Sequence, residues 1–244
     1  MRGHIRHKSM TILGMGEARM MAKLLISTVA VTVVIGVVLF VSAGTVDWPA
    51  AWGLLVETLL LNLAIGLWLA RHDPALLAER LGSPFQRAQK AWDKVFMAAV
   101  MVLYFAWVAL NGLDARWKLS WMPLWLQIVG AIGVALSMYI VLLTFRENTF
   151  AAPVVKIQRE RGQTVIGTGP YAYVRHPMYV GGILMFLTMP LLLGSWLGIA
   201  GTLLVVIPGL AFRIVMEERT LTAELEGYRD YAQRVRSRLI PGVW

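Results

Sequence analysis

Apolar and polar residues fall into long blocks along the chain rather than alternating with the short periods of a soluble fold. Six blocks are almost wholly apolar, at residues 24–44, 49–70, 91–113, 121–145, 179–194 and 197–216. A helix needs about 20 residues to cross a hydrocarbon core about 30 Å thick. The pattern therefore predicts six membrane-spanning helices, of which the fifth is short.

The last two apolar blocks carry prolines and are separated by very few residues. Pro190 lies inside the fifth block and Pro208 inside the sixth. A bilayer tolerates such breaks only where neighbouring helices or a cavity satisfy the freed carbonyl groups. We therefore predict a tight helical hairpin that turns at Gly194, Ser195 and Trp196.

After Met216 the chain turns polar, but apolar residues recur in it with a helical period. The spacing is 4, 3, 4, 3 and 4 residues along Leu221, Leu225, Tyr228, Ala232, Val235 and Leu239. This spacing predicts an amphipathic C-terminal helix with arginines on its opposite face, which Gly227 should bend or divide. Such a helix either only binds anionic lipid headgroups or also closes over a pocket.

Composition agrees with a single integral-membrane domain. Of the 244 residues, 58% are apolar and 15% charged, and the mean hydropathy is +0.64. We predict an all-α, polytopic membrane helix bundle, because the polar intervals are too short to build a core of their own. Its expected parts are a basic N-terminal tail at 1–23, a four-helix region at 24–145 and a candidate functional region at 146–244.

Positive charge is distributed unevenly along the chain. Lys and Arg number five in residues 1–23, five in 71–94, five in 146–175 and six in 213–238, which leaves two between the third and fourth blocks. By the positive-inside rule both termini face the cytoplasm, and we expect the inner or plasma membrane of a prokaryote. This asymmetry explains the net charge of +9 without a nucleic-acid partner.

The absence of cysteine removes several kinds of chemistry. With none in the chain, disulfides, thiolate-ligated zinc, iron–sulfur clusters and a cysteine nucleophile are all excluded. We expect no metal site.

The polar run from Gly169 to Gly182, GPYAYVRHPMYVGG, stands at the mouth of the fifth apolar block. Ionisable residues beside hydrocarbon are expensive, so they indicate a functional site. Its glycines let backbone approach a ligand, and its tyrosines can face a cation. The alternative is an arginine that reaches the interface among interfacial tyrosines.

A second charged group stands at the end of the sixth block, where Arg213 precedes Glu217 and Glu218. Arg213 and Glu217 are four residues apart and could simply pair along one helical face. However, apolar residues surround them, and charges in such surroundings usually face the bundle interior or a polar cavity. The hairpin brings both charged groups to the same side of the membrane, which favours one shared site.

These motifs resemble the isoprenylcysteine carboxyl methyltransferase and phospholipid methyltransferase superfamily over about the last 100 residues. Four features carry the resemblance, in the same order and spacing: Gln163-Thr164-Val165-Ile166, Gly169-Pro170-Tyr171, Arg175-His176-Pro177-Met178-Tyr179-Val180-Gly181, and Arg213 followed by Glu217-Glu218.

The resemblance implies a pocket for S-adenosyl-L-methionine. By position, Gln163, Thr164, Val165, Ile166 and Tyr171 would line the adenosine, and His176, Pro177, Met178 and Tyr179 would hold the methionine and ribose parts. Glu217 would take the ammonium group, and Arg175 or His176 would provide positive charge for the cofactor's carboxylate.

The resemblance also implies a methyl acceptor that is a lipophilic small molecule or a lipid. Arg213 would face the acceptor and could anchor a carboxylate, whereas an amine acceptor would need a base such as Glu218. Carboxyl methylation of a prenylcysteine-like compound, N-methylation of a phospholipid and S-methylation of a small thiol remain open, as does the oligomeric state.

Two other functions remain possible from the sequence. Sterol-type membrane reductases have a similar C-terminal hairpin and bind a nicotinamide cofactor there, although this chain shows no additional basic site for a 2′-phosphate. A non-catalytic membrane scaffold, whose arginines contact lipid, is the third possibility.

Overall fold

The computed structural model describes the backbone of residues 2–244 and the side chains of residues 16–244. Every regular element in that part of the chain is helical, which confirms the all-α prediction. The α-helices are α1 (Arg2–Ala43), α2 (Pro49–His72), α3 (Pro74–Arg80), α4 (Ala91–Trp117), α5 (Leu124–Glu147), α6 (Pro177–Leu193), α7 (Trp196–Gly201), α8 (Ile207–Glu224) and α9 (Tyr228–Arg234). Short 3₁₀ turns η1 (Arg159–Arg161) and η2 (Gly169–Ala172) lie between α5 and α6, and a π-helical turn η3 (Thr202–Val206) joins α7 to α8.

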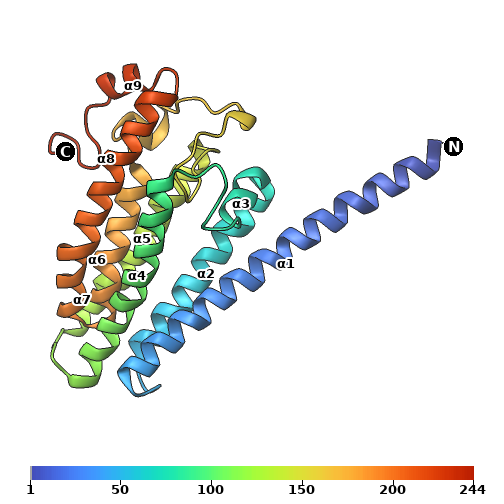
Figure 1. Cartoon of the computed structure of the whole chain (residues 1–244). Helices are drawn as coiled ribbons and strands as arrows, with labels where there is room; N and C mark the ends of the chain where they lie inside the picture. The colour runs from blue at the N-terminus through green and yellow to red at the C-terminus, as the bar shows by residue number, and fades with distance from the viewer. Residues whose placement is uncertain (1) are drawn as a thin grey trace.

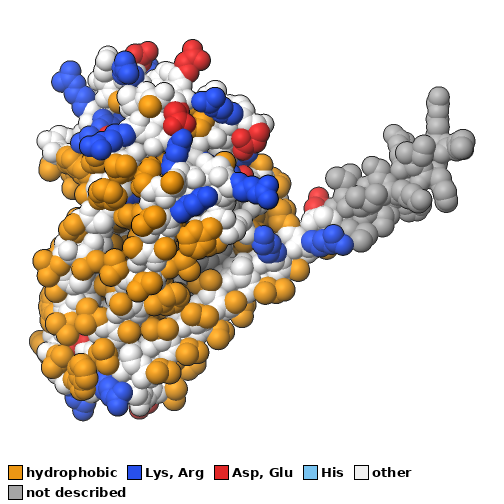
Figure 2. Space-filling model, viewed as in Figure 1, with side chains coloured by type: hydrophobic (Ala, Val, Ile, Leu, Met, Phe, Trp, Pro, Cys, Tyr) orange, Lys and Arg blue, Asp and Glu red, His pale blue; other side chains and the backbone are white. Residues whose placement is uncertain are grey.

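The six predicted spanning segments are all helical and lie side by side in a bundle (Figure 1). Five stretches are long and apolar enough to cross a membrane: Gly16–Ala43, Pro49–His72, Ala91–Trp117, Leu124–Glu147 and Trp196–Glu224. The remaining predicted segment, α6, has 17 residues and corresponds to the fifth apolar block, which the sequence predicts to be short. Figure 2 shows an apolar surface over the bundle, with most of the visible lysines and arginines gathered at one end. The molecule is therefore a polytopic helical membrane bundle.

The predicted hairpin turns where the sequence places it. Gly194 ends α6 with a left-handed φ of 79°, and the Ser195 hydroxyl accepts a hydrogen bond from the Gly198 amide at the start of α7. Pro190 cannot donate to the Phe186 carbonyl one turn earlier, and the Thr202 hydroxyl donates to that carbonyl instead, at 2.7 Å. The hairpin thus supplies from its second arm the hydrogen bond that the proline removes from its first.

Helices α5 and α6 pack closely because small residues line their interface. A methyl group added at Gly130 would overlap the backbone of Leu192, and one added at Gly181 would come within 2.9 Å of the Ser137 carbonyl oxygen. Small residues let membrane helices gain van der Waals contact by close approach of their backbones. This contact fixes the start of α6 against the end of α5.

At the turn of the hairpin the same bundle holds a buried carboxylate. Asp114, 1% exposed near the end of α4, accepts hydrogen bonds at Oδ2 from Ser195 Oγ (2.6 Å), Ser120 Oγ (2.7 Å) and the Leu197 amide (3.2 Å). We call these residues the turn cluster. It ties the tip of the hairpin to α4.

The C-terminal region differs in part from the prediction. Gly227, with φ of 79°, divides the polar helix as expected, so that α8 ends at Glu224 and α9 begins at Tyr228. The expectation of one apolar helical face as far as Leu239 is wrong, because α9 ends at Arg234. Backbone amides of Arg175 and His176 donate instead to the Ser237 and Arg238 carbonyls, which holds the non-helical last segment against the start of α6.

Two further features concern helix α3 and the N-terminal part of α1. The polar interval after α2 contains the short helix α3, capped by Asp73, whose carboxylate accepts from the Leu76 amide at 2.9 Å. The predicted boundary between a basic tail and the first span does not interrupt α1, which is continuous from Arg2 to Ala43. The part of the predicted tail before Gly16 lies outside the residues whose side chains are described.

Candidate functional site

The connection between α5 and α6 forms one wall of a pocket at the charged end of the bundle. Gln158 is fully buried. Its side chain donates from Nε2 to the Phe150 carbonyl at 2.8 Å, and its backbone amide donates to Gln163 Oε1 at 2.7 Å. Gly162 turns the chain between them with φ of 62°. The buried glutamine thereby fixes where the Gln163–Ile166 stretch passes the cavity.

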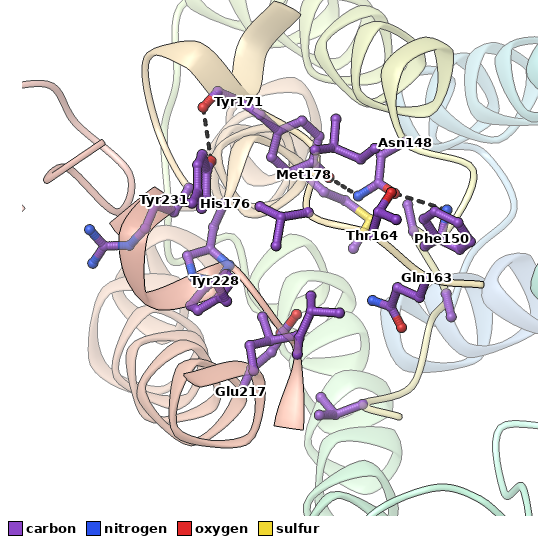
Figure 3. Close-up of a pocket in the computed structure, with 18 of the residues that line it drawn as sticks. Asn148, Phe150, Gln163, Thr164, Tyr171, His176, Met178, Glu217, Tyr228 and Tyr231 are labelled. Carbon is purple, nitrogen blue, oxygen red and sulfur yellow. Dashed lines mark hydrogen bonds between the residues drawn. The ribbon is translucent and has the colours of Figure 1, made fainter. Parts of the chain in front are cut away.

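A pair of tyrosines closes the side of the pocket beneath η2. The Tyr171 hydroxyl accepts from Asn148 Nδ2 at 2.8 Å, while the Tyr231 hydroxyl donates to the Tyr171 carbonyl at 2.8 Å (Figure 3). Burial raises the pKa of Tyr171 well above its ordinary value and that of Tyr231 to about 12. Both phenols are therefore neutral near pH 7 and present polar aromatic surface to a ligand.

Glu218 is the centre of a buried network of positive charge. Its Oε1 lies 2.6 Å from Arg175 Nε and 3.1 Å from His176 Nε2, and its Oε2 accepts from Arg238 Nε at 2.8 Å. Arg175 also donates from Nη1 to the Val235 and Arg236 carbonyls, each at 2.7 Å. The network binds the start of α6, the middle of α8 and the C-terminal segment to one another.

Glu217 has a different environment from its neighbour. Successive helical residues point about 100° apart, so the two carboxylates leave α8 in different directions. The Glu217 carboxylate lines the pocket and accepts one hydrogen bond, from the Tyr179 hydroxyl to Oε2 at 2.7 Å. Its other oxygen has no hydrogen-bond partner among the described residues, so this carboxylate can accept a donor from a ligand.

The pocket is open to solvent at its mouth, and with the mouth included it contains about 790 Å³ of empty space. Figure 3 shows Gln163, Met178, Glu217 and Tyr228 around one cavity. Tyr228 is 5% exposed, and its buried hydroxyl has no hydrogen-bond partner among the residues that the structure describes. Buried hydroxyls are rarely left unpaired, so a ligand group or water is the expected partner of this one.

Arg213 lies outside the lining of this pocket. Its Nη2 stands 3.2 Å from Asp93 Oδ1 and donates to the Pro153 carbonyl at 2.8 Å, and its guanidinium lies over the Phe96 ring at 5.6 Å. No ion pair joins it to Glu217. These contacts fasten α8 to α4 and to the α5–α6 connection.

The structure brings together ten of the eleven predicted cofactor-binding residues, all except Pro177. They are Gln163, Thr164, Val165, Ile166, Tyr171, Arg175, His176, Met178, Tyr179 and Glu217. Neither Arg213 nor Glu218, the two predicted catalytic residues, lines the pocket. Their roles toward an acceptor stay predictions, and their contacts favour a part in positioning the pocket walls.

Sequence reasoning missed part of the lining. Asn148, Phe150, Tyr228 and Tyr231 line the pocket, and none of them is among the predicted cofactor-binding residues. Tyr228 lay on the apolar face of the predicted C-terminal helix, which was the one signal available for it. Asn148 follows α5, and its side-chain oxygen accepts a hydrogen bond from the Phe150 amide at 2.8 Å, a local turn that asparagine forms for structural reasons alone.

Comparison with known proteins gives one match. Residues 125–226 match the family model described as phospholipid methyltransferase, a range that covers α5 to α8 and most of the pocket lining. This confirms the resemblance to the superfamily and indicates an integral-membrane methyltransferase. No curated protein matches the chain.

Proposed function

We propose that this protein is an S-adenosylmethionine-dependent integral-membrane methyltransferase whose donor site is the pocket between the α5–α6 connection, α6 and α8. The observation that carries the proposal is the convergence of Glu217 from α8 with His176 and Tyr179 from the start of α6 on one cavity. Glu217 is 38 positions from Tyr179 and 41 from His176 in sequence, and the hairpin brings it to them.

The residues present fit the chemical groups of this cofactor. Its ammonium group needs an anion, which the unsatisfied oxygen of Glu217 supplies, and its sulfonium is attracted by aromatic faces. Tyr228 offers a buried hydroxyl without a partner, and the backbone of 163–166 offers an edge for a planar base. When bound, S-adenosylmethionine supplies a methyl group that is already activated by the positively charged sulfur.

The chain's own contribution is to bind, orient and exclude water. Tyr179 holds the Glu217 carboxylate in a fixed rotamer, and the Glu218 network holds the α6 start in place. The neutral tyrosines and the apolar side chains of Val165, Leu221 and Leu225 form the less polar part of the cavity wall, and a bound ligand would displace water from it. Precise alignment in a dry site can contribute several kcal/mol, up to about 10, to lowering a transfer barrier.

The proposed acceptor is a lipophilic or membrane-embedded molecule, methylated at a carboxylate, an amine or a thiol. The match to a phospholipid methyltransferase model supports a lipid-like acceptor and leaves the accepting atom open.

The direct test is binding of S-adenosylhomocysteine to the purified protein in an uncharged detergent, followed by calorimetry. Glu217→Gln keeps the shape of the side chain and should weaken binding at least about tenfold, since it removes a charge-assisted hydrogen bond. Glu226→Gln is the matched control, because Glu226 is exposed in the same α8–α9 region and outside the pocket. Absence of binding by the unmodified protein, or displacement of the probe by NADPH, would overturn the proposal.

A further inference from the structure

A second cavity lies on the membrane side of the proposed donor pocket, between α1, α2, α4 and α6. It holds about 1140 Å³ of empty space including its mouth. Polar side chains are interspersed in its otherwise apolar wall, where Ser27 and Thr32 come from α1 and Thr58 and Asn62 from α2. Val31, 58% exposed on α1, also lines it, so the cavity reaches the apolar outer surface of the bundle.

Arg80, at the end of α3, lines this second cavity. Its Nη1 donates to the Ala151 carbonyl at 3.0 Å, and its guanidinium lies 4.3 Å from the centre of the Phe145 ring. Among the described side chains it forms no ion pair with Asp or Glu. Two other basic residues at this end of the bundle form such ion pairs, Lys156 with Glu79 and Arg213 with Asp93.

Arg80 is partly buried, and a partly buried cation without a counter-ion attracts anions that can reach it. Burial lowers the pKa of Arg80 to about 10, so the guanidinium is still fully charged near pH 7. Its Nε and Nη2 form no hydrogen bond to the described residues and are not fully enclosed, which leaves donors for a ligand. A guanidinium fork is well suited to carboxylate and phosphate oxygens.

Arg80 also marks the boundary between the two cavities. Its Nη1 lies 3.8 Å from Sδ of Met178, and Met178 lines the donor pocket. An unbranched methionine adapts its shape easily, so this partition is thin and deformable. A molecule in the second cavity would therefore bring its polar end to within one side chain of the donor site.

We propose that the second cavity binds the acceptor as an anionic amphiphile, with its apolar tail between α1, α2, α4 and α6 and its carboxylate or phosphate on Arg80. The inference rests on the proposed function for the role of the ligand as acceptor, but the binding itself can be measured without it. Arg80 acts here as a specificity-determining residue that selects lipids carrying negative charge near the reacting group.

The test counts bound amphiphiles by native mass spectrometry of the whole protein in dodecyl maltoside. Oleate and dioleoylphosphatidylethanolamine present a carboxylate and a phosphate diester, respectively, and dioleoylglycerol is the uncharged comparison. Arg80→Gln should weaken binding of whichever of these two probes, each with one anionic group, the cavity takes by about tenfold or more, with binding of dioleoylglycerol unchanged. Arg80→Lys should restore part of the affinity, because it keeps the charge and loses the fork.

Arg87→Gln is the matched control, since Arg87 is an exposed arginine on the same α3–α4 connection. Thr58→Phe is a second variant, which fills the cavity without touching Arg80 and should also exclude the anionic probes. Equal affinity in the unmodified protein and Arg80→Gln, or an equal loss in Arg87→Gln, overturns this inference.

Binding of S-adenosylhomocysteine, measured on the same samples, separates this result from the proposed function. Arg80 does not line the donor pocket, so its variants should keep that affinity, which also reports that they fold. A second outcome is that the unmodified protein does not bind S-adenosylhomocysteine, but does bind the amphiphile more tightly than the Arg80→Gln variant does. In that case the proposed function fails and the amphiphile-binding site stands.

Discussion

The two ends of the α6–α8 hairpin each bury a carboxylate among polar partners, yet only one of them encloses a cavity. At the turn cluster, Asp114 accepts hydrogen bonds from Ser195 and Leu197 at the hairpin tip and from Ser120 after α4. At the opposite end, Glu218 contacts Arg175 and His176 at the start of α6 and Arg238 in the C-terminal segment, and Glu217 beside it lines the pocket. The comparison teaches that burial of charge marks a site only where the packing around it leaves room.

The packing at the turn end is tight because its helices meet through glycines. A methyl group at Gly198 would overlap the Asn111 side chain, as one at Gly130 would overlap the backbone of Leu192. At the pocket end the close contact at Gly181 still joins α6 to α5, but bulky aromatic side chains and the irregular α5–α6 connection lie between α6 and α8. Long side chains on poorly matched backbones leave space between them, and that space is the pocket.

Asp114→Ala should have the largest effect and should act on stability alone. The Ser120 and Ser195 hydroxyls and the Leu197 amide lose their acceptor, which should lower the free energy of unfolding by about 3 kcal/mol. The measurement is thermal unfolding in detergent, with Asp47→Ala, an exposed aspartate at the same end, as control. A loss of S-adenosylhomocysteine affinity in folded Asp114→Ala would show that the two ends are coupled and would break the comparison.

Gly130→Ala should be the next most damaging change. The added methyl group meets backbone atoms of Leu192, which cannot rotate away, so α5 and α6 must separate at a cost of about 2 kcal/mol. Gly53→Ala in α2 is the control, because nothing lies within 4 Å of the new methyl group there. Equal melting temperatures for the two variants would contradict the close packing described for this interface.

The neighbours Glu217 and Glu218 should separate binding from stability. Glu218→Gln weakens contacts to Arg175, His176 and Arg238 and should lower the free energy of unfolding by about 2 kcal/mol, with S-adenosylhomocysteine affinity within a few-fold of normal. Glu217→Gln should show the reverse pattern. Both quantities can be measured on each variant by thermal unfolding and calorimetry. If Glu218→Gln instead kept full stability and lost methyl transfer only, Glu218 would act as the predicted base.

Tyr231→Phe should have the smallest effect, visible in the pH dependence of stability. The pKa of Tyr231 is raised to about 12 in the folded protein, so between about pH 10 and 12 the unfolded state releases a proton that the folded state keeps. Stability therefore falls as pH rises through that window, by at most about 1.4 kcal/mol per pH unit for this group. Melting temperatures from pH 9 to 11.5 should decline less steeply in Tyr231→Phe. Parallel curves would mean that the phenol is not protected by burial.

The sequence by itself determined the class of protein, the number of apolar helical segments and most of the residues that line one pocket. The lengths of the apolar blocks predict the membrane-spanning helices, because a helix in hydrocarbon must pair all of its own backbone N–H and C=O groups. The Gly194-Ser195 turn and the Gly227 break followed from local conformational preference. The motif at 169–182 and the carboxylate at Glu217 indicated a shared site because a two-helix hairpin leaves little freedom in how its ends meet.

Only the tertiary structure decided which charges face the cavity and which hold its walls. Glu217 and Glu218 are indistinguishable as letters, and their roles differ because a one-residue step on α8 turns the side chain toward or away from Arg175. Arg213 has the acid partner Asp93 from a helix more than 100 residues earlier, whereas Arg80 forms no such pair among the described side chains. Pairing across the bundle depends on how helices pack side by side, and no local pattern in the chain encodes it.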